Sequence, residues 1–167
     1  MTSFRGLIRI GGVALFSAMV IAGFAVAASC GGDDDDAAST PTPNAVAGKL
    51  TIDRGWVRTT TNDVAAAYFQ VKNAGLDDTL LSVSAGIGSM AMIHETVTEG
   101  ASSKMQEVTG GVDVPANGEV TFSPGGYHVM IMGLTSPLSE GNSVDLTLQF
   151  KNAGAVNIKV PVLAAAP

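Results

Sequence analysis

The chain has 167 residues, of which 46% are hydrophobic and 14% are charged, and its formal net charge is −6 at pH 7. This length and composition allow one ordinary domain with a core of its own. Residues 49–167 carry 7 basic against 11 acidic side chains. Such a balance attracts neither nucleic acid nor anionic lipid, so both are excluded as partners of the domain.

The N-terminal segment 1–30 has the features of a secretion signal. Arg5 and Arg9 precede an uncharged apolar run over 10–28, and Cys30, the only cysteine, follows where that run ends. The sequence "AASC" before a glycine resembles a bacterial lipobox, in which the cysteine is lipidated and becomes the new N-terminus. A retained single-span anchor and simple cleavage remain alternatives. All three place the domain outside the cytoplasm, in the periplasm or at the outer face of the cell membrane.

Residues 31–48 differ in composition from what precedes and follows them. They read "GGDDDDAASTPTPNAVAG", with four consecutive aspartates and no apolar periodicity. Segments of this kind cannot bury enough apolar surface to fold, so we expect a disordered tether. The folded domain is therefore expected over 49–167.

From Lys49 onward, short runs of alternating apolar residues are separated by turns rich in Gly, Pro, Asn and Asp, and no helix is predicted. In the last two expected strands, which the turn "NAG" joins as a hairpin, one residue type alternates with another along the chain. Each strand is expected to gather its apolar residues on one face: Val144, Leu146, Leu148 and Phe150 in the first, and Val156, Ile158 and Val160 in the second. The expected strands are 49–58, 65–73, 79–85, 89–97, 104–108, 119–123, 127–133, 143–152 and 155–162. About nine short strands predict an all-β fold, a Greek-key β-sandwich or small barrel.

The domain contains two histidines, His94 and His128, and no cysteine if Cys30 belongs to the anchor. This excludes thiol catalysis and a blue-copper centre, which needs a cysteine ligand. No Gly-x-Ser-x-Gly sequence accompanies either histidine, which disfavours a serine hydrolase. We therefore expect a protein that is not an enzyme.

Both histidines belong to stripes of soft side chains, because residues two apart on a strand point to the same face. The stripes are Met90, Met92 and His94, and His128, Met130 and Met132. Beside the second stripe, Tyr127, Val129 and Ile131 form the apolar row of the opposite face, which is expected to face the core. Met90, Met92 and Met132 are interpreted as packing residues, which is the commoner role of methionine on a strand.

Met105 is predicted to join the first stripe through a hairpin. A two-residue turn at Glu99 and Gly100 would place Met105 directly opposite His94, with Cβ atoms about 5 Å apart. His128 and Met130, two apart on one strand, could converge on one ion. Two imidazoles and two thioethers favour Cu(I), because thioethers are soft and neutral.

The spacing His94, ten residues, Met105, twenty-two residues, His128-x-Met130 resembles the His/Met motif of the PCuAC family of extracytoplasmic copper chaperones. The segments "RGWVRTT", "AAAYFQVKNAG", "IHET", "GGVDVPANG" and "PGGYHVMIMGL" occur in that family's order, and the resemblance covers the domain.

The resemblance implies a cupredoxin-like Greek-key sandwich in which His94, Met105, His128 and Met130 bind Cu(I). It also implies delivery of copper towards the CuA site in subunit II of cytochrome c oxidase, directly or with a Sco-type protein. Beyond the resemblance, we expect weaker binding of Cu(II) and a monomer held at the membrane through its lipid or an uncleaved anchor. Two alternatives stay open. One is an envelope copper buffer without a dedicated acceptor, and the other is an interaction sandwich without metal.

Overall fold

The computed structural model describes residues 43–100 and 102–167, all within one compact unit, Ser39–Pro167. The predicted signal, Cys30 and most of the predicted tether lie outside the described residues. Among residues 43–100 and 102–167 there is no helix long and apolar enough to cross a membrane.

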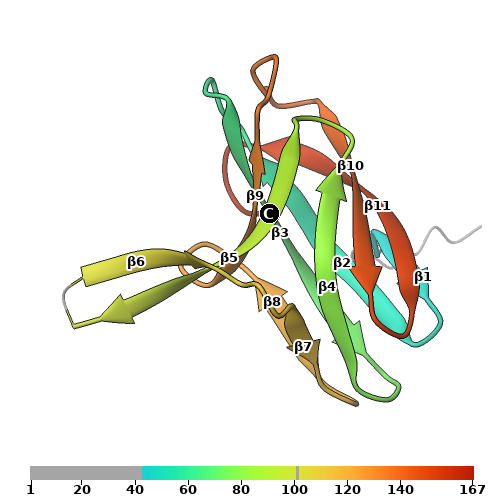
Figure 1. Ribbon diagram of the computed structural model, residues 1–167. Coiled ribbons are helices and arrows are strands. Elements are labelled where there is room, and N and C mark those ends of the chain that lie inside the picture. Colours follow the sequence, from blue (N-terminus) through green and yellow to red (C-terminus); the bar gives the residue numbers. More distant parts are fainter. Residues whose placement is uncertain (1–42, 101) are drawn as a thin grey trace, which may run out of the picture. The chain divides into compact units, whose positions relative to one another are not determined.

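The described domain consists of β-strands, which confirms the all-β prediction (Figure 1). The strands are β1 (Ala45–Ala47), β2 (Leu50–Arg58), β3 (Val64–Asn73), β4 (Asp78–Ala85), β5 (Met90–Glu99), β6 (Ser102–Glu107), β7 (Val112–Val114), β8 (Glu119–Phe122), β9 (Tyr127–Met132), β10 (Ser143–Phe150) and β11 (Gly154–Leu163). The described part thus holds eleven strands, where about nine were predicted. The additional strands, β1 and β7, have three residues each, too few for an alternating pattern to show in the sequence.

Strand β1 lies inside the segment predicted as tether. Its three residues pair antiparallel with β2, with Ala45 opposite Ile52. Just before it, the Asn44 side chain accepts a hydrogen bond from the backbone N–H of Gly55 at 2.7 Å. This bond holds Asn44 at the bulge of β2, where Arg54 has a φ of 50°. The paired strand structure therefore begins a few residues before Lys49.

The strands form two layers that are joined by a short parallel contact. One layer has the order β6-β5-β9-β8-β3-β2, with β1 at its end, and the other has the order β11-β10-β4-β7. The layers connect where Val162 and Leu163 of β11 pair with Val57 and Arg58 of β2. The β5–β6 hairpin projects beyond the rest of the domain in Figure 1.

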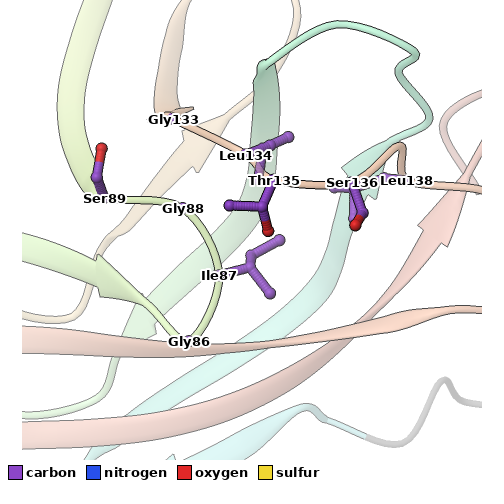
Figure 2. A pocket seen from close by; sticks show the side chains of 9 residues that line it. All are labelled: Gly86, Ile87, Gly88, Ser89, Gly133, Leu134, Thr135, Ser136 and Leu138. Atoms are coloured by element: carbon purple, nitrogen blue, oxygen red, sulfur yellow. The ribbon is translucent and has the colours of Figure 1, made fainter.

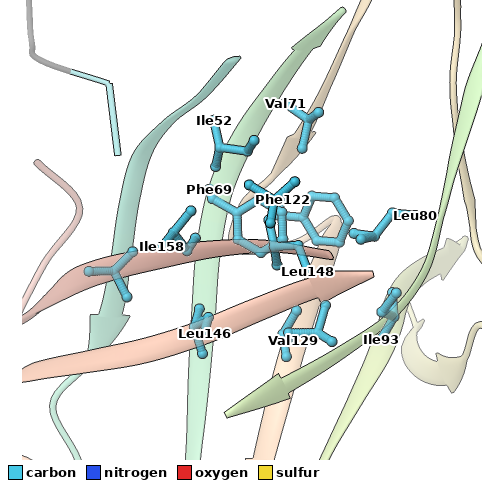
Figure 3. Close-up of a cluster of buried hydrophobic side chains, with 14 of the residues drawn as sticks. Ile52, Phe69, Val71, Leu80, Ile93, Phe122, Val129, Leu146, Leu148 and Ile158 are labelled. Atoms are coloured by element: carbon cyan, nitrogen blue, oxygen red, sulfur yellow. The ribbon is translucent and has the colours of Figure 1, made fainter. Parts of the chain in front are cut away.

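The core lies between the two layers (Figure 3). Phe69 of β3 and Phe122 of β8 stack there with ring centroids 4.4 Å apart. The alternation predicted for the last two strands is confirmed, since β10 and β11 pair through a hairpin and bury every second residue. The buried residues of these strands are Val144, Leu146, Leu148 and Phe150 on β10, and Val156, Ile158, Val160 and Val162 on β11.

Candidate metal centre

Both histidines, and all five methionines that the structure describes, lie on the neighbouring strands β6, β5 and β9. Strand β5 pairs antiparallel with β9, which places His94 opposite His128 and Met92 opposite Met130. Directly opposed residues on neighbouring strands share a face of the sheet. The two predicted stripes are therefore joined side by side on one face.

The two imidazole rings are close enough to share one ion. The ring centroids of His94 and His128 are 5.9 Å apart, and the planes are inclined by 77°. An imidazole nitrogen bonds a metal at roughly 2.0–2.1 Å, so two rings on one ion have centroids about 5 to 6.5 Å apart. The observed separation lies within this range.

The ring nitrogens of the pair differ in their hydrogen bonding. His128 Nδ1 lies 3.0 Å from the carbonyl oxygen of Gly126. A carbonyl only accepts, so Nδ1 carries the proton and the lone pair remains on Nε2. His94 Nδ1 is buried and, among the described residues, has no hydrogen-bond partner. Because a buried polar atom without a partner costs free energy, an ion bound there would satisfy this nitrogen.

Strand β9 presents its soft residues away from the core, as its sequence pattern predicts. Val129 and Ile131 are fully buried in the core, whereas Met130 is half-buried on the opposite face. His128 is also on that face and only 5% exposed. The apolar side of β9 thus anchors the strand, and the other side carries two possible ligands two residues apart.

The predicted position of Met105 directly opposite His94 is wrong by two residues. Strands β5 and β6 pair with His94 opposite Glu107 and Met105 opposite Thr96. The pairing closes at Glu99 and Ser102, so the turn starts at Gly100 rather than at Glu99. Gly100 has a φ of 64°, the left-handed conformation that glycine adopts without strain at the start of such a turn.

Met105 nevertheless remains on the ligand face. A shift of two residues keeps the same side chains on the same side of a strand. Met105 is now the diagonal neighbour of His94, and such neighbours lie roughly 7–8 Å apart, within reach of a long side chain. The Met105 side chain is 60% exposed, so it is free to move toward the histidines.

Two tyrosines beside His128 are kept neutral. Burial raises the pKa of Tyr68, whose ring centroid is 6.5 Å from that of His128, while the charge of Arg58 acts in the opposite direction. Burial also raises the pKa of Tyr127, and the carboxylate of Glu95 on β5 raises it further. Tyr127 packs against the core next to Phe122, so only Tyr68 lies near the face of the histidines. A phenol is already protonated near neutral pH, and the raised pKa of Tyr68 strengthens this, so Tyr68 offers no phenolate oxygen to a hard metal ion.

Comparison with known proteins assigns the family. The LpqE-like family profile matches residues 50–162. The chain belongs to the LpqE-like family. A protein of Leifsonia xyli subsp. xyli (strain CTCB07) named "Putative lipoprotein Lxx21020" is 33% identical over 126 residues, which are 75% of this chain and 76% of that protein.

Several solved structures similar to this LpqE-like chain are PCuAC domains, as the sequence resemblance predicts. The apo PCuAC domain from PmoF1 has a TM-score of 0.61 and 27% identity, and the match covers 72% of this chain and 98% of that domain. The copper-bound PCuAC domain from PmoF2 has a TM-score of 0.60 and 26% identity over 72% of this chain and 97% of that domain. DR1885 from Deinococcus radiodurans, solved with Cu(I), has a TM-score of 0.52 at 24% identity, covers 75% of this chain and 82% of that chain, and supports the fold alone.

The packing role predicted for Met90, Met92 and Met132 is not what the LpqE-like domain shows. None of the three is buried or belongs to the described core, and Met90 is 51% exposed. Met92 lies opposite Met130, and Met90 lies opposite Met132. These pairs depend on contact between β5 and β9, which are separated by β6 to β8 in the chain, so no local signal in the sequence could reveal them.

A pocket of about 380 Å³ lies beside the methionine end of this face (Figure 2). It is bounded by residues 86–89, which lead into Met90, and by residues that follow Met132. The pocket is lined by Gly86, Ile87, Gly88, Ser89, Gly133, Leu134, Thr135, Ser136 and Leu138. These side chains are aliphatic or hydroxyl-bearing, so the soft and imidazole donors of the LpqE-like domain belong to the neighbouring sheet face rather than to this pocket.

Proposed function

We propose that this LpqE-like chain is an extracytoplasmic metallochaperone that binds Cu(I) through His94, Met105, His128 and Met130. The observation that carries the proposal is the opposed pair of imidazoles, 5.9 Å apart, with thioethers on the same sheet face. The similarity to the copper-bound PCuAC domain from PmoF2 supports it independently of that geometry.

The chemistry of these donors favours the reduced ion. Thioethers are soft ligands that select Cu(I), and imidazole binds copper in either oxidation state. Methionine also cannot be lost to disulfide formation in an oxidising compartment. Cu(II) would depend on the imidazoles and would bind more weakly.

Release by ligand exchange follows from the unequal exposure of the donors. Met105 is 60% exposed on the projecting hairpin, whereas His128 is 5% exposed and hydrogen-bonded to Gly126. An incoming ligand of an acceptor protein can therefore replace the Met105 thioether first. The deeper imidazoles would hold the ion until that exchange has begun.

The proposed acceptor is the CuA site in subunit II of cytochrome c oxidase, reached directly or through a Sco-type protein. In a strain that lacks this chain, oxidase activity at limiting copper is expected to fall several-fold, and added copper should restore it. Complementation with the wild-type chain should also restore activity, whereas a His94→Ala, His128→Ala chain should not. Undiminished CuA loading in the deletion strain would leave a copper buffer as the better description.

We further propose that Cys30 is lipidated, so that the domain works at the membrane surface. The sequence around Cys30 and the name of the Leifsonia relative support this. Mass spectrometry of the mature protein is expected to find Cys30 at the N-terminus with a diacylglycerol mass added. An N-terminus downstream of residue 30, or an unmodified Cys30 in an uncleaved chain, would contradict it.

A further inference from the structure

Methionine is distributed in the described domain in a way that packing does not explain. Methionine commonly fills gaps in hydrophobic cores. Here the described core contains no methionine, and all five described methionines gather on β5, β6 and β9. Three of them, Met90, Met92 and Met132, are not needed for the site proposed above.

These three residues are neighbours on one sheet face. Met90 and Met132 are directly opposed, and Met92 is two residues from Met90 on the same strand. Directly opposed Cβ atoms are about 4.5–5.5 Å apart, and residues two apart on a strand are about 6.6–6.8 Å apart. Flexible side chains with three rotatable bonds can close such gaps, so the three sulfur atoms can meet at one point.

We propose that Met90, Met92 and Met132 form a second, weaker Cu(I) site made of thioethers alone. Three neutral soft donors select Cu(I) and offer little to Cu(II), Zn²⁺ or other harder ions. The site lacks an imidazole, so it binds Cu(I) more weakly than the histidine site does. Met90 is 51% exposed, which leaves the site open to incoming copper.

The second site is placed to exchange copper with the first. The opposed pair Met92 and Met130 lies between the pair Met90 and Met132 and the histidine pair. Successive pairs are therefore separated by about 6.6–6.8 Å along the strands. Cu(I) can thus pass from the all-thioether site to the histidines by exchanging one sulfur ligand at a time. This transfer rests on the proposed function, whereas the existence of the second site does not.

The test follows the methyl groups of methionine by NMR. The full chain carrying Cys30→Ser, labelled with ¹³C at the methionine methyl groups, is titrated with Cu(I) anaerobically in detergent micelles. The first equivalent is expected to shift the signals of Met105 and Met130, and the second equivalent to shift those of Met90, Met92 and Met132. Met1 and Met19, outside the domain, serve as internal references.

Two variants separate the sites. In the triple variant Met90→Leu, Met92→Leu, Met132→Leu, the first equivalent of Cu(I) is expected to bind as in the wild type, and binding of the second equivalent is expected to be lost. The control variant Met19→Leu is expected to bind both equivalents. In His94→Ala, His128→Ala, the first site is lost and the three methyl signals still shift. If the signals of Met90 and Met132 stay unchanged after two equivalents, or shift together with Met130 in the first, a separate second site is refuted. If the His94→Ala, His128→Ala variant binds the first equivalent of Cu(I) as tightly as the wild type, the proposed histidine site is contradicted. That result does not contradict the second site, which contains no histidine.

Discussion

The double variant Met105→Leu, Met130→Leu is expected to bind Cu(I) roughly 1,000-fold more weakly than the wild type, or about 4 kcal/mol, because it loses both proposed thioether ligands. Its affinity for Cu(II) is expected to change less than about tenfold, since both imidazoles remain. Leucine is similar to methionine in volume, and Met105 is largely exposed, so the fold should be retained. Competition against Cu(I)- and Cu(II)-specific chromogenic chelators measures both affinities.

A matched control lies on the same hairpin. Thr96 is directly opposite Met105, so Thr96→Val changes the surface next to the proposed site without removing a soft donor. Its affinity for Cu(I) is expected to equal that of the wild type. Wild-type affinity in the Met105→Leu, Met130→Leu protein would show that these sulfurs do not bind the ion.

Replacing a histidine is instead expected to weaken the binding of copper in both oxidation states. In His128→Ala, binding of Cu(I) and of Cu(II) is expected to fall by more than about 100-fold each, because changes at groups that only support a ligand already cost 10–100-fold. The same competition titrations measure the loss. This variant also removes a buried ring and its hydrogen bond to Gly126, which is expected to lower the free energy of unfolding by about 1–3 kcal/mol.

His94→Ala separates loss of the ligand from loss of stability. The Nδ1 atom of His94 has no hydrogen-bond partner within the described part of the chain, so its removal breaks no such bond. Copper affinity is expected to fall as in His128→Ala, while the urea midpoint stays near that of the wild type. If His94→Ala retained wild-type affinity for both ions, the opposed imidazoles would not be the centre of the site.

The parts of the fold that follow local rules could be predicted from the sequence. The alternation over Val144 to Phe150 fixes which face of β10 is buried, and the same reasoning assigns Val129 and Ile131 to the core and Met130 to the opposite face. The side of the sheet on which each candidate ligand lies was therefore predictable. The short strand Val112–Val114 was not, because three residues carry too little pattern.

What could not be predicted depends on contacts between distant segments or on turn geometry. The pairing of Met92 with Met130 requires β5 to lie beside β9, and local periodicity says nothing of that. The position of Met105 depended on which residue begins the turn, and the sequence alone allowed Glu99 or Gly100. Because the turn begins at Gly100, Met105 is the diagonal neighbour of His94 rather than, as predicted, the residue directly opposite it.

The register of the β5–β6 hairpin also limits which changes in length β6 tolerates between the turn and Met105. If the turn keeps its two residues, one residue added to β6 before Met105 shifts the pairing by one, so that Met105 points away from His94. Two added residues would instead place Met105 directly opposite His94, on the same face as now. The constraint on this segment is therefore one of parity: only a change by an even number of residues keeps the methionine on the face of the histidines.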